Sequence, residues 1–292
     1  MALPMITPEL LLEGVVDGLM LGFLYALAAM GLSLIFGVLD IINFAHGDLI
    51  MLAAYMVYLI ALSSGNLWIA LVVTVGAFTV LGFIIYRGLI QPVIGKEPLI
   101  QIAITVGLGL VLQNVALALF RAEPKGIPQS VLPYTFSAGP LHVSAAKLLV
   151  AAVSAATLLA THLYLTRTRQ GLAARAVADN RESAWLMGIN VPTTYMLTFG
   201  LGTALTALAA FLWMLIGPVN PYLGTTFGLI TWVIVALGGL GGVSGTLVAG
   251  LIVGALDGLG SVVLTPSGKY ILVYIAFILT IWFRPRGLFG RR

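Results

Sequence analysis

The sequence predicts an all-α polytopic membrane protein, and three observations lead to this fold class. Hydrophobic residues make up 60% of the 292 residues and charged residues only 8%, whereas a soluble domain has about 25% charged residues. The apolar runs are continuous and about 20 residues long, the length of a membrane-spanning helix. Strands of a membrane barrel would instead alternate apolar and polar residues. We therefore expect one transmembrane domain over residues 1–292, built of helices that satisfy their own backbone hydrogen bonds in lipid.

Nine apolar ranges are candidates for spanning helices. The ranges 46–63 and 226–240 are short and bounded by glycine or polar residues, so each is a candidate half-helix. We expect eight or nine spans, with short or broken helices among them. In chain order the ranges are 10–37, 46–63, 67–87, 99–120, 145–166, 192–216, 226–240, 243–264 and 268–284.

The Lys and Arg residues predict the orientation, because cytoplasmic loops carry an excess of them. With nine crossings, ten lie on one side: Arg87, Lys96, Arg167, Arg169, Arg175, Arg181, Arg284, Arg286, Arg291 and Arg292. The other side has four: Arg121, Lys125, Lys147 and Lys269. We therefore expect the N-terminus outside and the C-terminus in the cytoplasm.

Two sets of glycines spaced four residues apart predict close helix packing, since each set lines one helical face and lets another backbone approach. The sets are Gly14, Gly18 and Gly22, and Gly250, Gly254 and Gly258. Both contain the same pattern, GVVDG and GALDG, which a weak internal duplication or chance would produce. The pattern places Asp17 and Asp257 inside spans, as ion or proton sites or as partners of a hydroxyl or Arg across a helix interface.

Residues 40–48, DIINFAHGD, gather polar groups between two apolar runs. A broken helix here would present free backbone N–H groups and a helix N-terminus, which favour a carboxylate ligand. The alternative is a polar cytoplasmic turn with Asp48 in the first turn of the next helix. His46 either titrates as a proton relay or hydrogen-bonds a backbone carbonyl and holds the break in place. Tyr25 either points into a pathway or packs as an ordinary aromatic.

Several chemistries are absent from the sequence. There is no cysteine, which excludes disulfides and thiol nucleophiles. His142 and His162 lie far from His46, and neither a Ser-His-Asp nor an HExxH spacing exists, so we expect no catalytic residue and no metal site. The cluster GGLGGVSG at 238–245 lacks the lysine of a phosphate-binding loop, so we expect a tight re-entrant turn and no ATP site. No long basic patch for nucleic acid is present.

One long basic loop, residues 166–191, interrupts the apolar pattern. It predicts two helices, from about Thr168 to Val177 and from Asp179, where Glu182 would complete a capping box. The second helix is expected to end near Gly188, in a left-handed C-cap, before Pro192 opens the next span.

The second helix of this loop offers small or apolar side chains, Ala184, Leu186 and Met187. Such a helix fits a groove in a partner protein. The alternative is an amphipathic helix lying on anionic lipid. Docking on a protein is favoured because Asp179 and Glu182 suit anionic lipid poorly.

Four stretches resemble the permease subunits of ABC importers of the branched-chain amino acid type, and the similarity runs almost end to end. The segment INFAHGD and the terminal RPRGLFG are the specific ones, and the pattern resembles the smaller of the family's two permeases. The stretches are GLMLGFLYALAAMGLSLIFGVLDIINFAHGDLIMLAAY (18–55), GLAARAVADNRESAWLMGIN (171–190), GGLGGVSGTLVAGLIVG (238–254) and RPRGLFG (284–290).

The resemblance implies a type II importer fold and a division of labour. An extracytoplasmic solute-binding protein delivers the solute, a second and paralogous permease completes the pathway, and two cytoplasmic ATPases hold ATP and Mg while this chain binds no cofactor. It also implies a multi-pass subunit of a bacterial or archaeal cytoplasmic (inner) membrane, surrounded by lipid.

The resemblance also implies site residues. The INFAHGD match places Asn43 and His46 near the translocation pathway, and we add Tyr25 and Asp48 as candidates. The 166–191 loop matches the place of ATPase coupling, with Arg175, Asp179, Glu182, Ala184, Leu186 and Gly188 as its candidate residues.

The solutes of the resembling family include branched-chain and other amino acids, urea and short amides, and aromatic acids. We expect branched-chain or related amino acids. Two other classes remain as alternatives: a stand-alone proton-coupled secondary transporter using Asp17, His46 or Asp257, and an intramembrane enzyme, which would need a nucleophile-base or metal pair at membrane depth.

Overall fold

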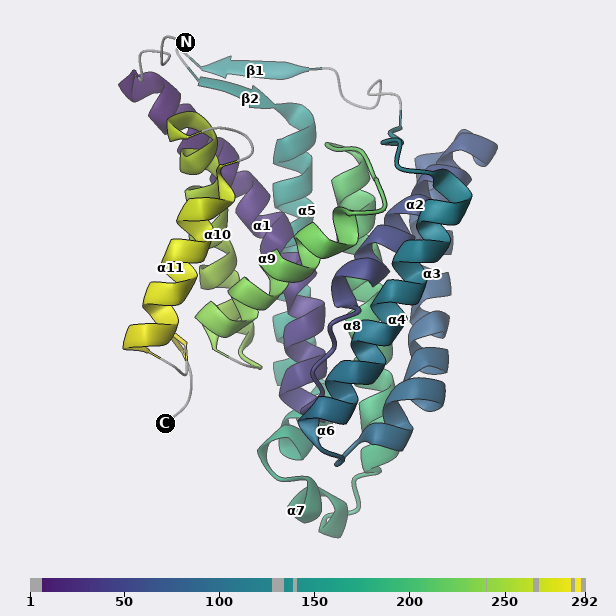
Figure 1. The fold of residues 1–292 in the computed structure, drawn as a ribbon. Helices are drawn as coiled ribbons and strands as arrows, with labels where there is room; N and C mark the ends of the chain where they lie inside the picture. Colours follow the sequence, from purple (N-terminus) through teal and green to yellow (C-terminus); the bar gives the residue numbers. More distant parts are fainter. Residues whose placement is uncertain are drawn as a thin grey trace.

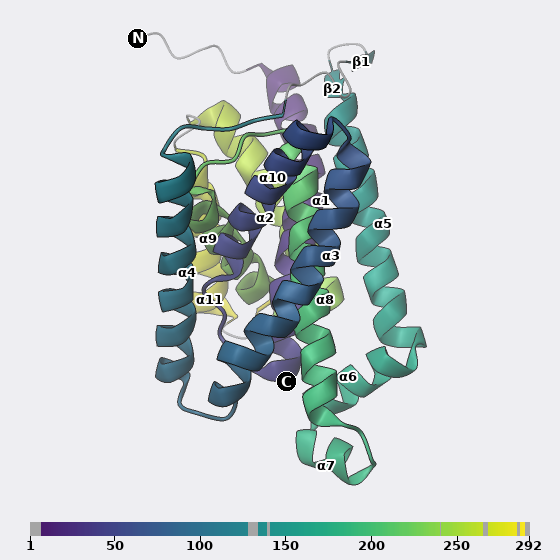
Figure 2. The ribbon, with the colours of Figure 1, turned by 90° about the vertical axis from the view of Figure 1, so that its right-hand side faces the viewer.

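Helix α1 (Pro8–Leu39) is the central element of the fold. The structure is a computed structural model that describes residues 7–127, 134–138, 141–239, 241–264, 268–284 and 287–289. Within the apolar window of each helix, 78% of the residues of α1 and 67% of those of α8 (Val191–Met214) are buried, against 17% for α4 (Pro98–Phe120). The core therefore lies along α1 and α8, and α4 lies at the periphery (Figure 1, Figure 2).

The predicted all-α polytopic fold is confirmed. Seven helices are long and apolar enough to cross a membrane, and two shorter apolar helices accompany them in the described ranges. Besides α1, α4 and α8, the long ones are α2 (His46–Ser64), α3 (Leu67–Ile85), α5 (Ala145–Arg167) and α10 (Val243–Val263); the short ones are α9 (Leu223–Gly238) and α11 (Tyr270–Phe283). A π-helical turn, η1 (Tyr86–Ile90), and a 3₁₀ turn, η2 (Gln91–Val93), extend α3.

The two ranges predicted to be short behave differently. Helix α9 has 16 residues, or about 24 Å at 1.5 Å per residue, which is less than a bilayer core. Helix α2 has 19 residues, which by length and composition is enough to span a membrane. Its irregularity lies instead in its start, described below. The last helix, α11, is the second short one, with 14 residues.

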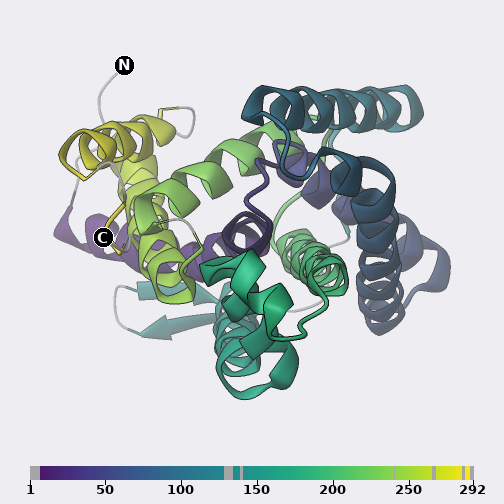
Figure 3. The same ribbon diagram turned by 90° about the horizontal axis from the view of Figure 1, so that it is seen from below.

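The elements outside the bundle lie at its two ends (Figure 1). At the end where α1 begins, β1 (Thr135–Ala138) and β2 (Leu141–Ser144) form an antiparallel pair that pairs Thr135 with Ser144. This pair was not predicted, because two four-residue strands carry little periodicity. At the opposite end lie α6 (Arg169–Asp179) and α7 (Arg181–Leu186), seen nearest the viewer in Figure 3.

The two glycine sets face each other across α1 and α10. A Cβ added at Gly14 would lie 3.0 Å from the Gly258 carbonyl oxygen, and one at Gly22 would lie 2.8 Å from that of Gly250. A Cβ at Gly18 would collide with the Gly254 carbonyl. The helices therefore run antiparallel with their backbones in contact, which only glycine permits at these positions.

Asparagine and threonine side chains set the starts of several helices by accepting a hydrogen bond from the first turn. Asn66 caps α3 through the Trp68 N–H at 2.9 Å, and Asn190 caps α8 through the Thr193 N–H at 3.1 Å. Pro192 lies in the first turn of α8, as predicted, where its missing N–H costs nothing.

The basic loop forms two helices, but the predicted capping residue is wrong. Asp179 ends α6, and Asn180 begins α7 by accepting from the Ser183 N–H at 2.8 Å. Asn180 has extended backbone angles and its side chain accepts from the N–H of the third helical residue, which is the capping role expected of Asp179. At the other end Gly188 has φ +84°, and its N–H donates to the Trp185 carbonyl at 2.9 Å while the Ile189 N–H donates to that of Ala184. These bonds form a Schellman C-cap.

Candidate translocation site and coupling loop

The candidate site is a break in the helical structure between α1 and α2. α1 ends at Asp40, which has a left-handed backbone (φ 54°) and donates its N–H to the Phe36 carbonyl. Residues 40–45 then run back into the bundle, so that α2 begins part-way along the length of α1 (Figure 1, Figure 2). Its N-cap, Ala45, makes no side-chain capping bond. The N-terminal end of α2, with its free N–H groups and positive dipole, is therefore inside the bundle.

Thr105 of α4 holds the non-helical segment in place. Its hydroxyl donates to the Ile42 carbonyl at 3.0 Å and accepts from the Phe44 N–H at 3.2 Å. The side chain is 1% exposed, so two backbone groups that have left the helical ladder are satisfied without water. The sequence analysis did not find this residue, although a threonine within an apolar span is the signal that was available.

His46 anchors the start of α2 to α1. The ring is fully buried, and its Nε2 lies 2.9 Å from the Ala28 carbonyl oxygen. Of the two roles considered for His46, the hydrogen bond to a backbone carbonyl is the one present. Nδ1 has no partner among the described residues.

Asn43 and Asp48 lie on either side of His46 in the chain and differ in their surroundings. Asn43 is 1% exposed, and its Nδ2 has no hydrogen-bond partner in the described part of the chain. The partly buried Asp48 carboxylate lies between α4 and α9, where Gly109 and Gly224 leave room for it: a Cβ at Gly109 would lie 2.5 Å from Oδ2. The break thus offers an unsatisfied amide donor and a carboxylate beside a helix N-terminus.

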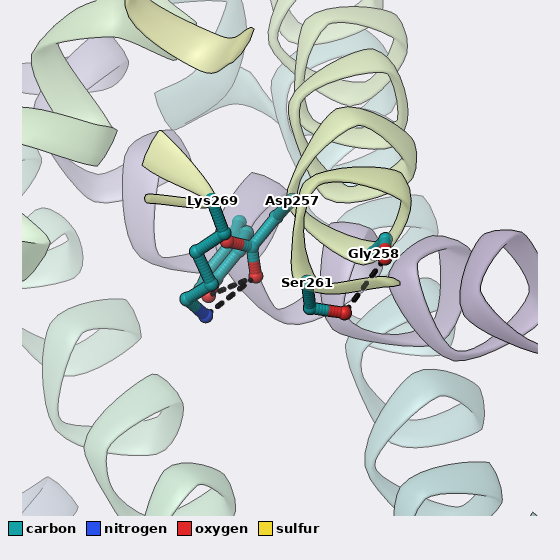
Figure 4. A network of polar contacts seen from close by, with 5 residues as sticks. Asp257, Gly258, Ser261 and Lys269 are labelled. Carbon is teal, nitrogen blue, oxygen red and sulfur yellow. Dashed lines mark hydrogen bonds and ion pairs between the residues drawn. The ribbon is translucent and has the colours of Figure 1, made fainter. Parts of the chain in front are cut away.

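Tyr25 does not join this group. It is 2% exposed, its ring packs edge-on against Phe227 at 5.9 Å, and its hydroxyl donates to Asp257 Oδ2 at 3.2 Å. Asp257 is also paired with Lys269 at 3.0 Å (Figure 4). Tyr25 thus packs between α1, α9 and α10, with its hydroxyl on Asp257.

The two intramembrane aspartates are held by lysines. Asp17 on α1 pairs with Lys147 of α5 at 2.6 Å, and Asp257 on α10 pairs with Lys269, the residue before α11. Contacts with a hydroxyl or Arg across a helix interface were expected: Asp257 accepts from the Tyr25 hydroxyl, and the cation in both pairs is a lysine instead of Arg. Lys147 lies in the first turn of α5 and Lys269 directly precedes α11. The first pair therefore joins α5 to the central α1, and the second joins the start of α11 to α10.

At the opposite end, the candidate coupling loop, residues 166–191, exposes an apolar tip at the end of its second helix, α7. Trp185, Leu186 and Met187 are 67%, 76% and 83% exposed. Ala184, predicted as a contact residue, is 4% exposed and packs inside the chain, so it is not available to a partner. The predicted charged residues Arg175 and Glu182 are exposed. Trp185 is a residue of this tip that the sequence analysis missed.

The fold and the site define a class: a multi-pass membrane transport protein with a discontinuous helix in its core and an exposed two-helix loop at one end. No group of three or more potential metal-ligating side chains occurs in the described ranges.

Comparison with known proteins defines the family. Residues 14–281 match the family of the permease component of branched-chain amino acid transport systems, and the chain belongs to it. It is thus a transport subunit of an ABC importer and not itself an enzyme.

The relatives cover almost the whole chain. BraD, a high-affinity branched-chain amino acid transport system permease of Pseudomonas aeruginosa, is 31% identical over 96% of both chains. LivH of Escherichia coli, described in the same words, is 30% identical over 96% of both. Among solved structures, PsaBC from Streptococcus pneumoniae in complex with Fab matches 94% of this chain and 93% of its own with a TM-score of 0.52 at 15% identity, a likeness of fold alone.

Proposed function

We propose that this chain forms one half of the translocation pathway of an ABC importer for amino acids, with branched-chain amino acids as the substrate class. Its relatives BraD and LivH are named as permeases of branched-chain amino acid transport. The observation that carries the proposal is the break at residues 40–45, which sets the N-terminus of α2, the Asn43 amide and the Asp48 carboxylate inside the bundle.

The chemistry of the break suits a zwitterion. A helix N-terminus and an amide donor favour a carboxylate, while Asp48 favours an ammonium group. Near the break, Phe44 and Trp232 pack with their ring centroids 5.2 Å apart, and Phe44 is 43% exposed. Apolar rings beside paired polar groups suit an amino acid with an aliphatic side chain. The relevant site residues are Asn43, His46 and Asp48, with His46 in a supporting position.

A second permease, paralogous to this chain, completes the pathway in this proposal. α4 is only 17% buried over its apolar window and carries exposed Leu110 and Val111. Gln113 of α4 donates to Thr225 of α9 at 3.5 Å on an exposed face. A polar pair on an otherwise apolar face that lies next to the break suits a subunit interface around a pathway better than lipid.

Two cytoplasmic ATPases carry ATP and Mg and dock on the coupling loop. Trp185, Leu186 and Met187 enter a groove on the ATPase, and Arg175, Asp179, Glu182 and Gly188 shape and flank the loop. Orientation follows from this docking: α6 and α7 lie in the cytoplasm, the N-terminus outside, and an extracytoplasmic binding protein delivers solute at the end with β1 and β2.

The proposal is tested by reconstituting this chain with its neighbouring permease, ATPase and binding-protein subunits in proteoliposomes. We expect uptake of leucine, isoleucine or valine that requires ATP, the binding protein and both permeases. ATP-driven uptake of urea or an aromatic acid, and not of these amino acids, would transfer the proposal to another solute. Uptake by this chain alone, driven by a proton gradient and indifferent to ATP, would overturn it. The lysine partners of Asp17 and Asp257 count against such a proton-coupled carrier.

A further inference from the structure

An apolar groove lies between α3 and α4. Helix α2 packs against both of these helices, whereas α3 and α4 barely contact each other in the described ranges. α2 therefore forms the floor of the groove, and α3 and α4 form its walls (Figure 2). The groove has a volume of about 680 Å³, which is within the range of small-molecule sites.

The walls of the groove belong to the hydrocarbon region of a membrane. Every lining side chain except Tyr55 is apolar, and α3 and α4 are both long and apolar enough to cross a bilayer. Val80 and Ile84 of α3 and Leu119 of α4 are exposed. Exposed apolar side chains on spanning helices lie among acyl chains, so the groove is open to the chain of a lipid.

The groove has a polar group where α4 ends. Tyr55 of α2 and Phe120, the last residue of α4, both line it, and their rings stack with centroids 4.0 Å apart. Tyr55 is 1% exposed, and its hydroxyl has no hydrogen-bond partner in the described part of the chain. A buried phenol normally donates to an acceptor. A ligand in the groove would supply that acceptor.

A cation lies at the same end of the groove. Arg121 directly follows Phe120, is exposed, and forms no ion pair among the described residues. The next two charged residues, Glu123 and Lys125, pair with each other at 2.9 Å. The uncompensated charge beside this end of the groove is therefore positive, and it would attract an anionic lipid headgroup.

This groove is separate from the face of α4 that we assign to the second permease. Gln113 bonds to α9, and Leu119 lines the groove; at 3.6 residues per turn the two lie about 120° apart around the helix. A helix of another subunit would match only the apolar walls. A phospholipid matches all three features, because it offers an acyl chain, an ester carbonyl for Tyr55 and a phosphate for Arg121.

We propose that the groove between α2, α3 and α4 binds an anionic phospholipid, with an acyl chain along the groove, an ester carbonyl at the Tyr55 hydroxyl and the phosphate at Arg121. The lipid belongs to the leaflet in which α4 ends, the outer leaflet in the proposed orientation. Because α4 contacts mainly α2, a lipid that fills the groove also stabilises the position of α4 and of Thr105, which holds the break.

The first experiment uses phosphatidylglycerol that carries a diazirine on an acyl chain. The complete transporter is placed in phosphatidylcholine nanodiscs with a small fraction of this probe, irradiated and digested for mass spectrometry. Helix α11, which has exposed apolar residues, reports ordinary contact with lipid. We expect the groove segments of α2, α3 and α4 to be labelled at least about tenfold more than α11, which corresponds to about 1.4 kcal/mol. Equal labelling of the groove and α11 would overturn the site.

Filling the groove tests its position without removing a contact. Gly76 lines the groove, and a Cβ added there meets nothing within 4 Å. Gly76→Phe should therefore occupy the space and reduce labelling of α2 and α4 at least about tenfold. Gly107→Phe on α4, where a Cβ also meets nothing within 4 Å, lies outside the lining and is the matched control. Undiminished labelling in a folded Gly76→Phe variant would contradict the site.

The headgroup contacts are tested by substitutions that leave the groove open. Tyr55→Phe and Arg121→Gln should each weaken labelling by the phosphatidylglycerol probe, whereas Lys125→Gln, a nearby cation that is paired with Glu123, should not. The parent should prefer this probe to a phosphatidylcholine with the same diazirine, and Arg121→Gln should remove the preference. Equal labelling of the parent by the two lipids would contradict the anionic headgroup.

The alternative occupant, a helix of the second permease, gives a different result. The chain has no cysteine of its own, so Val80→Cys can carry a short thiol-linked photocrosslinker as its single thiol. Capture of the second permease from this position, with no lipid labelling of the groove, would overturn the lipid site. None of these measurements requires uptake of solute, so this inference and the proposed function can fail independently.

Discussion

At the scale of single residues, the polar groups inside the membrane fall into two kinds. Asp17 and Asp257 are paired with Lys147 and Lys269 and fasten helices together. Asn43 keeps an unsatisfied donor at the break, and the Asp48 carboxylate lies against Gly109 and Gly224 without an ion pair among the described residues. An ion pair reduces the free-energy cost of burying its two charges. An unsatisfied polar group inside the membrane needs a ligand or partner to reduce that cost.

Removing one member of the inner ion pair should destabilise the protein. Lys269→Met leaves the Asp257 carboxylate, 2% exposed, without its cation. We expect a loss of about 2–4 kcal/mol, because an uncompensated buried charge is costly. Thermal unfolding in detergent measures it, and the double variant Lys269→Met, Asp257→Asn should recover much of the loss. A single variant as stable as the parent would show that the pair is not formed.

His46 should matter for stability before it matters for transport. His46→Ala removes the hydrogen bond to the Ala28 carbonyl and leaves a cavity at a fully buried position, so we expect a loss of about 2–4 kcal/mol. Thermal unfolding of the purified chain measures this, and His162→Ala, at an exposed position, is the control. Normal stability with abolished transport would instead favour a role of His46 in the pathway.

At the scale of elements, the contact of α1 with α10 depends on glycine. Gly18→Ala places a methyl group against the Gly254 carbonyl, whereas Gly76→Ala on α3 meets nothing within 4 Å. We expect Gly18→Ala to cost about 1–3 kcal/mol by overpacking and Gly76→Ala to be neutral or slightly stabilising. Thermal unfolding of both variants compares them; equal stability would show that the two backbones are not in contact.

A charge at the tip of the coupling loop should prevent docking of the ATPases and leave folding of the permease unaffected. Met187→Asp places a charge on a side chain that is 83% exposed, so the permease itself should be unaffected. We expect co-purification of the ATPases and ATP-driven uptake to fall at least about tenfold, equivalent to about 1.4 kcal/mol of binding free energy. Arg169→Asp, in the same loop but away from the tip, serves as the control. Normal co-purification and uptake in Met187→Asp would show that the tip is not part of the ATPase interface.

At the scale of the whole molecule, the orientation can be measured with single cysteines, again because the chain has none of its own. Glu123, whose side chain is 70% exposed, lies between α4 and β1, and Met187 lies at the coupling loop. In intact cells, Glu123→Cys should react with a membrane-impermeant maleimide, while Met187→Cys should react only after permeabilisation. The reverse pattern would invert the proposed orientation, which rests on the distribution of Lys and Arg.

The fold class was predictable from the sequence because lipid leaves few choices. Continuous apolar runs must be helices, and their number and order followed directly. The lengths of the helices were harder to predict. The break at residues 40–45 lies before α2 and does not interrupt it, so α2 has 19 residues. The predicted N-cap of α7, Asp179, lies one residue before the actual one, Asn180. Both side chains can form the capping bond, and the extended backbone of Asn180 makes it the cap.

The candidate site was only partly predictable. DIINFAHGD marked the break, but Thr105, Gly109 and Gly224 come from α4 and α9, far away in sequence, and only the packing brings them to it. Ala184 shows the converse: its small apolar side chain suited a docking surface by composition, and the fold buries it. The Tyr25 hydroxyl lies beside Asp257, a partner 232 residues away that no local pattern indicates.

By itself the sequence determined that this chain crosses a membrane as helices and where its basic loop lies, because composition and local spacing carry that information. Only the tertiary structure decided which polar residues are paired and which remain open. Pairing depends on contacts such as Asp17 with Lys147 and His46 with Ala28, and the distance between such partners is set by how helices pack, which no local pattern encodes.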